Sequence, residues 1–282
     1  MKTRKPAAIA AGSLSLLLAL TACGNEEPAA EGTADADEAS SGSALEELLG
    51  NMGSSTQELT NYTLDMEVQT LDPTAEGDVT VTFNYQVTDD PAAILATVDM
   101  PFLGETMFEL MSMAGGVPDG VTAEDLGAST VLLTEDGDTL IADPHGVYGA
   151  GTPWFRGEVD ENADPTESFD VEALPDLAGA FSDLEDVTEV GTEEIDGVET
   201  TVVEGTMSTG DISELSAEER GAVEKLFSGG LESAMDAKLW LDADGFPMRI
   251  EFSDDESDVW MEFSAIGSTS FDMPSEDEIG TV

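Results

Sequence analysis

Hydrophobic and polar residues alternate over much of the chain. In two long stretches, 62–68 and 79–87, every second residue is apolar and the residues between are polar. A period of two is typical of a strand that buries one face. The same pattern returns in shorter runs at 131–133, 139–142, 198–203, 239–241, 248–252 and 259–263. The pattern therefore predicts a sheet with one apolar and one polar face.

Asp-Gly pairs stand between successive runs of this kind, at 136–137, 196–197 and 244–245. Asp-Gly readily adopts the positive φ angles that tight hairpin turns require. Strand-like runs continue from Tyr62 to Phe263 without a second linker between them. We therefore expect one α+β domain, built on a single, mainly antiparallel sheet.

Four segments instead have the spacing of amphipathic helices. Leu45 to Met52 would lead into the first strand, and 171–184 would form a second helix. Ser216, with Glu219 three residues later, has the pattern of a capping box and would open a third helix running toward Met235. We expect these helices to interrupt the sheet in a few places.

The fourth helical segment, from Met100 to Val117, is unusually apolar. Large Phe, Leu and Met side chains crowd around only two charges, Glu105 and Glu109, and four of the twelve methionines of the chain lie here. Methionine side chains are flexible and polarizable, so such a surface can repack around ligands of different shape. Two interpretations stay open: the segment plugs the concave side of the sheet, or it lines or gates an apolar cavity.

The first 23 residues have the features of an export signal. Lys2, Arg4 and Lys5 precede an apolar run at 7–19, which is shorter than the roughly 20 residues of a membrane-spanning helix. The following Leu20-Thr21-Ala22-Cys23 resembles the bacterial lipobox. That resemblance implies a signal peptide at 1–22 and a Cys23 that carries diacylglyceryl and N-acyl groups such as palmitate. We expect a protein anchored to the outer face of the cell membrane.

The residues after Cys23 are acidic and small. Glu, Ala, Asp, Gly, Ser and Thr dominate up to Ser43, with no aromatic residue, so this stretch cannot bury enough apolar surface to offset its ordering entropy. We expect residues 23–43 to be a lipidated, flexible tether and residues 44–282 to be the folded domain.

The charge balance of the chain is extreme. The chain has 62 acidic residues and 8 Lys or Arg residues, which gives a net charge of −54. Binding to nucleic acid by neutralising phosphates is excluded, because no basic surface can be built. The acids are spread along the chain, as in the solvated surface of a halophilic protein. We therefore expect salt to stabilise the fold.

The residue types needed for common catalytic mechanisms are scarce. Cys23 is the only cysteine, His145 is the only histidine, and no Gly-x-Ser-x-Gly motif occurs. His145 follows Asp143-Pro144 and precedes a glycine, which is typical of a turn. The acidic loops at 136–138 and 242–245 lack the ligand spacing of an EF-hand and fit hairpin turns better. We expect no catalytic residue, no metal site and no cofactor.

Several pieces of the second half resemble the actinobacterial LppX/LprA/LprF/LprG lipoproteins. The pieces are Val190-Gly191-Thr192-Glu193, Ile195-Asp196-Gly197-Val198-Glu199-Thr200, Gly205-Thr206, Leu239-Trp240-Leu241-Asp242 with Asp244-Gly245, Pro247 and Arg249, and Gly267 followed by Pro274; Tyr148 and Trp154 are similar to an earlier pair. The resemblance implies a single curved antiparallel sheet, a half-barrel similar to LolA, that is closed by several helices around a hydrophobic cavity. It also implies binding and transport of envelope lipids or glycolipids, without catalysis.

Alternation and this resemblance together predict the lining of the cavity. The candidates are inward-facing residues of the strands and of the Met-rich segment: Phe83, Tyr85, Met107, Phe108, Met111, Leu239, Leu241, Ile250 and Phe263. Trp154 and Trp240 are candidates for the rim, since indole combines an apolar ring with an N–H donor. The expected partners are an acyl lipid or glycolipid, the membrane through Cys23, and a transport partner protein in the envelope.

Two other classes of function stay open. A structural or signalling envelope lipoprotein would have a fully packed core and act through protein contacts. An envelope hydrolase would depend on His145 or on a pair of carboxylates that the sequence does not single out.

Overall fold

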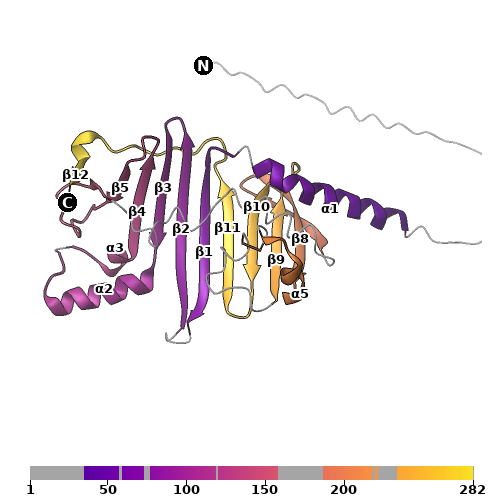
Figure 1. The fold of residues 1–282 in the computed structure, drawn as a ribbon, viewed down its shortest axis with the longest axis horizontal. Helices are drawn as coiled ribbons and strands as arrows, with labels where there is room; N and C mark the ends of the chain where they lie inside the picture. Colours follow the sequence, from indigo (N-terminus) through magenta and orange to yellow (C-terminus); the bar gives the residue numbers. More distant parts are fainter. Residues whose placement is uncertain are drawn as a thin grey trace, which may run out of the picture.

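The computed structural model describes residues 35–56, 59–72, 77–118, 120–157, 187–217, 220–221 and 234–281. The strands in these ranges form one 12-stranded sheet, in the order β12-β6-β5-β4-β3-β2-β1-β11-β10-β9-β8-β7 (Figure 1). Neighbouring strands are antiparallel except for β12 and β6, which are parallel. The sheet is open, with β12 and β7 at its edges. The predicted single, mainly antiparallel sheet with helices is confirmed.

The strands span Tyr62–Asp72 (β1), Gly77–Asp89 (β2), Ala92–Asp99 (β3), Ala128–Thr134 (β4), Thr139–Ala142 (β5), Trp154–Arg156 (β6), Thr188–Ile195 (β7), Val198–Met207 (β8), Met235–Leu241 (β9), Pro247–Ser253 (β10), Ser257–Ser264 (β11) and Ile279–Thr281 (β12). The helices are Asp35–Thr56 (α1), Pro101–Ala114 (α2), Ala123–Gly127 (α3) and Thr209–Glu214 (α5), with a 3-10 turn at Glu276–Glu278. None of the described helices is both long and apolar enough to cross a bilayer.

The strand register divides the sheet into two faces. One row crosses five strands through Met66, Met261, Ile250, Leu239 and Val203, each directly opposite the next. All five side chains are buried. We call this side the apolar face and the other side the polar face. The row shows how a sequence period of two becomes a continuous hydrophobic surface once antiparallel strands are in register.

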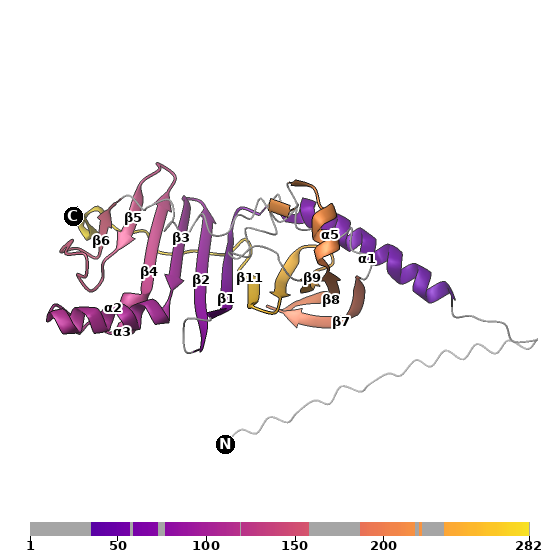
Figure 2. The same cartoon turned by 60° about the horizontal axis from the view of Figure 1, so that its bottom comes forward.

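Helix α1 covers the apolar face beside β8–β11 (Figures 1 and 2). Leu49 and Met52 of α1 are 5% and 0% exposed and join the main core. The helix begins at Asp35, so residues 35–43 of the predicted tether are helical. Helix elongation is easy once a nucleus exists, and the buried second half of α1 supplies that nucleus for the Ala- and Glu-containing residues before it.

All eight period-two runs lie in strands, and the three Asp-Gly pairs lie in the β4–β5, β7–β8 and β9–β10 turns. In the β7–β8 turn, Asp196 and Gly197 have φ angles of 48° and 80°, as a tight hairpin requires.

The pattern did not indicate β3, because the sequence of this strand does not alternate between apolar and polar residues. Both of its faces are covered. Ala93 and Leu95 belong to a second hydrophobic cluster on the polar face, and Ala96 is buried on the apolar face.

Two predicted helices fall largely or wholly outside the described residues. The segment 171–184 is outside them altogether. Of the helix expected from Ser216, residues 217, 220 and 221 are described as helical, and the Arg220 N–H donates to the Ser216 carbonyl over 3.0 Å. The expected run toward Met235 is wrong at its end, since Met235 is fully buried as the first residue of β9.

Candidate functional site

A groove of about 670 Å³ lies on the apolar face at the β2–β4 part of the sheet. Its floor is formed by Val81 and Phe83 of β2 and Val98 of β3. Helix α2 contributes Leu103 and Met107 to one wall. The other lining residues are Met100, just before α2, and residues of α3, the start of β4 and the segment 142–148. The lining is mainly apolar, and its volume is in the usual range for small-ligand sites, about 300–1,000 Å³.

Helix α2 is positioned by close contact with α3. Gly104 is the only buried residue of α2 and packs against Ala123 and Gly127 of α3. Pro101 occupies the start of α2, where its missing N–H costs nothing, and Gly115 ends the helix with a φ angle of 70°. These features fix which side of α2 faces the groove.

The loop opposite α2 is organised by Asp143. This carboxylate is 4% exposed and accepts hydrogen bonds from the backbone N–H groups of Tyr148 and Ala150, each over 3.1 Å. The Tyr148 ring packs at 5.4 Å from the ring of Phe155. A buried carboxylate needs such partners, and here they hold the loop as a wall of the groove.

One polar pair lies at this wall. His145 Nε2 is 3.1 Å from Asp125 Oδ1, which joins the loop to α3. The backbone N–H and the hydroxyl of Thr122 both donate to Asp125, and these hydrogen bonds, with a smaller contribution from His145, lower the pKa of its carboxyl group. The groove therefore combines an apolar floor with hydrogen-bonding groups at one side, as recognition of an amphipathic ligand requires.

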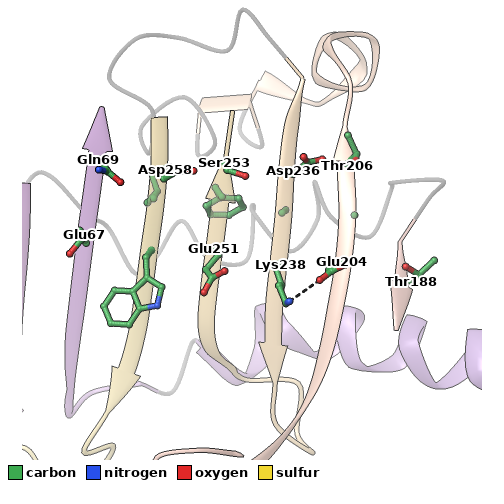
Figure 3. Close-up of a pocket in the computed structure, with 15 residues that line it drawn as sticks. Glu67, Gln69, Thr188, Glu204, Thr206, Asp236, Lys238, Glu251, Ser253 and Asp258 are labelled. Atoms are coloured by element: carbon green, nitrogen blue, oxygen red, sulfur yellow. Dashed lines mark hydrogen bonds and ion pairs between the residues drawn. The ribbon is translucent and has the colours of Figure 1, made fainter. Parts of the chain in front are cut away.

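A second groove, of about 660 Å³, lies on the polar face across β1 and β11–β7 (Figure 3). One cross-strand row contains Glu67, Trp260, Glu251, Lys238 and Glu204. A second row contains Gln69, Asp258, Ser253, Asp236 and Thr206. Lys238 Nζ is 2.8 Å from Glu204 Oε1, and this hydrogen bond is the largest cause of the raised pKa of Lys238. Its lining carries many charges, so it is unsuited to an acyl chain.

Two tryptophans, Trp240 of β9 and Trp260 of β11, lie on this polar face. Trp240 is 3% exposed and donates from Nε1 to Glu193 Oε2 over 2.8 Å. The Arg249 guanidinium lies 5.2 Å from the Trp240 ring and 5.8 Å from the Trp260 ring. Arg249 Nε also donates to Glu262 over 2.8 Å. The few cations on this face are thus engaged in ion pairs and ring contacts.

The structure brings two of the nine predicted cavity residues, Phe83 and Met107, to the lining of the apolar groove. Tyr85 lies next to it, with its ring stacked 6.2 Å from that of Phe83. Phe108 and Met111 are partly buried on α2 and do not line the groove. The remaining four candidates are fully or almost fully buried in the main core: Leu239, Leu241, Ile250 and Phe263.

The two predicted rim residues lie on the opposite face of the sheet. Trp154 packs on the second cluster, around Leu132 and Leu140. Trp240 is covered by Lys238 and Arg249. Cys23 is outside the described residues. His145 is in a turn, as predicted, and also lines the groove.

Sequence reasoning missed several lining residues. Val81 could have been found from the sequence, because it belongs to the same period-two pattern as Phe83. Val98 could not, because it lies in β3, the strand without alternation. Asp125 and Asp143 gave no signal, being two acids among 62. Within the described ranges, no group of three or more His, Cys, Asp or Glu could hold a metal ion.

Comparisons with known proteins give structural neighbours only. No protein-family model matches the sequence, and no curated protein sequence matches it either. Among solved structures, LprF from Mycobacterium bovis is 15% identical with a TM-score of 0.47, covering 83% of this chain and 97% of that chain. LppX from Mycobacterium tuberculosis is 16% identical with a TM-score of 0.45, covering 81% and 98%. LprF and LppX are both members of the LppX/LprA/LprF/LprG group of lipoproteins, which several pieces of this sequence resemble.

Proposed function

We propose that this protein is an exported lipoprotein that binds, and carries, acyl lipids or glycolipids of the cell envelope. The observation that carries the proposal is the apolar groove on the sheet, with its floor of Val81, Phe83 and Val98. Each square ångström of apolar ligand surface removed from water there contributes roughly 25 cal/mol. An acyl chain is therefore the ligand that gains most from this lining.

The polar side of the groove suits the other end of such a lipid. Asp125 and His145 can accept from or donate to hydroxyl groups of a head group. Binding and release need no nucleophile and no general base. The proposed activity is thus reversible lipid binding, without catalysis.

The anchor belongs to the same proposal. Residues 1–22 would be removed as a signal peptide, and lipidated Cys23 would hold residues 44–282 on the outer face of the membrane through the acidic segment 23–43. Each buried methylene of the acyl groups contributes roughly 0.8 kcal/mol, so two or three chains give stable anchoring. A transport partner in the envelope would load or unload the groove.

One observation favours the alternative of a packed structural or signalling module. In the half of the sheet beneath α1, side chains such as Leu239 and Phe263 are fully or almost fully buried against the rest of the core. If the groove is too shallow to retain a lipid, the protein would act through protein contacts.

Native mass spectrometry with lipid extraction separates the two functions. The chain from residue 23, with Cys23→Ser, would be expressed in a bacterial host and purified without detergent. The lipid-binding function predicts a co-purifying acyl lipid that leaves on denaturation, and uptake of a fluorescent fatty-acyl probe. A bare polypeptide mass with no probe uptake in high salt would overturn it.

A matched pair of variants links uptake to this groove. Met107 lines it and is 37% exposed, whereas Met273 lies elsewhere and is 38% exposed. Met107→Glu places a charge in the groove and should weaken probe binding about tenfold or more, because burying an unpaired carboxylate is costly. Met273→Glu should leave binding unchanged. Equal affinities for the two variants would place the probe elsewhere.

A further inference from the structure

Exposed apolar side chains gather on a single helix. Of the ten large hydrophobic residues that are exposed in the described ranges, five belong to the 14 residues of α2. They are Phe102 (57%), Leu103 (41%), Met107 (37%), Leu110 (57%) and Met113 (78%). On a chain with a net charge of −54, this is a marked local exception. Contiguous apolar patches of this kind mark interaction surfaces.

The helical period places these five side chains in one sector. At roughly 100° per residue, Phe102, Leu110 and Met113 lie next to Leu103 and Met107 around the helix. Glu105 and Glu109 lie at the opposite edge of this sector, beyond Phe102. Leu103 and Met107 line the groove. The apolar surface therefore continues from inside the groove onto the outside of α2.

The outward orientation is built into the packing. Gly104 is buried against α3, so the helix cannot rotate to bury the opposite side without removing this contact. The Gly115 N–H donates to the Ser112 carbonyl and the Gly116 N–H to the Met111 carbonyl, which closes the end of the helix. The exposure of Phe102 and Met113 is thus fixed by an ordered helix.

We propose that the outer apolar side of α2 docks onto the surface of a lipid bilayer and places the groove at that surface. The proposal rests on the proposed lipid-binding function. A lipid that moves between bilayer and groove must keep its acyl chain out of water, and α2 supplies an apolar path between them. Flexible Leu and Met side chains suit an acyl interface, and an amphipathic helix lying in the membrane plane is a common form of such contact.

The chain outside the structure favours a membrane as the occupant. Gly24 to Ala34 link the candidate anchor Cys23 to the start of α1 and span at most about 40 Å when extended. The first turn of α1 and helix α2 both lie toward the same lower side of the molecule in Figure 2. A domain held at this distance by its N-terminus can bring α2 against the same bilayer.

The charge distribution also favours lipid over a second copy of the chain. Two copies with a net charge of −54 each repel one another, and α2 has no basic residue that could pair with acids of a partner copy. Contact with zwitterionic lipid, which has no net charge, avoids this repulsion, provided that salt screens the remaining acids.

Vesicle flotation tests the docking. The chain from residue 23 with Cys23→Ser would be mixed with phosphatidylcholine vesicles in about 1 M NaCl, where the Debye length is roughly 3 Å. We expect the protein to float with the vesicles. The triple variant Phe102→Ser, Leu110→Ser and Met113→Ser should bind about tenfold more weakly or worse, because three apolar side chains leave the interface. The double variant Val190→Ser and Ile266→Ser removes exposed apolar residues elsewhere and should float like the parent.

A second measurement separates docking from lipid binding. The three altered side chains of α2 do not line the groove, so the triple variant should bind a monomeric fatty-acyl probe normally but extract a fluorescent lipid from vesicles more slowly. Normal probe binding with no flotation of the parent would overturn the docking and leave the groove function intact. If the parent itself takes up no probe, the proposed lipid binding in the groove would be overturned instead. A dimer by light scattering that disappears in the triple variant would assign α2 to self-association.

Discussion

Gly104 of α2 lies so close to the backbone of Gly127 of α3 that position 104 has no room for a side chain. A Cβ on Gly104 would lie 2.6 Å from the backbone nitrogen of Gly127, and one on Gly127 would lie 2.9 Å from the Met100 carbonyl oxygen. The Met100 N–H donates to the Gly127 carbonyl over 2.9 Å. This contact sets the distance of α2 from the sheet and hence the width of the groove.

Gly104→Ala should therefore destabilise the protein and weaken probe binding. Overpacking costs about 1–3 kcal/mol, which exceeds the gain of about 1 kcal/mol from replacing a helical glycine. Gly116→Ala is the matched control, since a Cβ there meets nothing within 4 Å. Thermal unfolding and probe titration would be compared for both. Equal melting temperatures would show that α2 can move away from α3 freely.

Arg249 and Glu262 should be energetically coupled. The pair is about three-quarters buried, with exposed fractions of 23% and 24%, and the guanidinium also contacts two indole rings. A double-mutant cycle with Arg249→Ala and Glu262→Ala should give a coupling of about 1.5–3 kcal/mol in urea unfolding. The more exposed Lys238–Glu204 pair should give about 1 kcal/mol or less. Additive effects of the two Arg249 and Glu262 substitutions would contradict this expectation.

Glu251→Gln should stabilise the protein at neutral pH. Burial raises the pKa of Glu251 above its ordinary value of 4.5, although Arg249 and Lys238 oppose the shift. The folded state thus holds this proton more tightly than the unfolded chain, and stability is lost as the pH rises from 4.5 through the higher folded value. Above this pH range, Glu251→Gln should have a higher melting temperature than the parent. Below it, the two melting temperatures should be equal.

The pH dependence of stability should have the opposite sign at Asp125, and this residue therefore serves as the control. Hydrogen bonds from Thr122 lower the pKa of this carboxyl group from 3.8, so its contribution is present at neutral pH and is lost as the pH falls through the lowered value. Asp125→Asn should be less stable than the parent at pH 7, and the difference should shrink in acid. Parallel melting curves for Glu251→Gln and the parent at every pH would rule out a burial cost at Glu251.

Salt should raise the melting temperature of the whole chain. With 62 acids and 8 Lys or Arg residues, repulsion opposes the compact state, and the Debye length falls from about 10 Å at 0.1 M to roughly 3 Å at 1 M salt. Melting would be followed in dilute buffer, in molar KCl and in an uncharged osmolyte at equal osmolality. A melting temperature that is unchanged or lower in KCl would contradict the interpretation of a halophilic surface.

Local pattern was enough for most of the sheet. Leu64, Met66 and Val68 alternate with polar neighbours, so their strand and its buried face follow from the sequence. The Asp196-Gly197 turn follows from the φ angles these residues tolerate. Strand β3 could not be found in this way, because Leu95 and Ala96 on its two faces are both covered and the alternation disappears.

The position of the groove along the sheet required the tertiary structure. Ile250 and Phe83 follow the same pattern and lie on the same face, yet Ile250 is sealed in the core beneath α1 while Phe83 borders the groove. Alternation gives the face of a residue and carries no information on which helix lies above it. Asp143 likewise looks like any other acid until the loop folds around it.

Residue type and neighbours along the chain suffice for the acidic surface, the resemblance to an export signal, the hairpins and the apolar side of the sheet. The tertiary structure was needed to divide the apolar residues into those of the filled core and those that line a groove. It also decided that Phe102 and Met113 of α2 face outward. Both outcomes depend on contacts between segments far apart in sequence, such as that between Gly104 and Gly127, which no local pattern encodes.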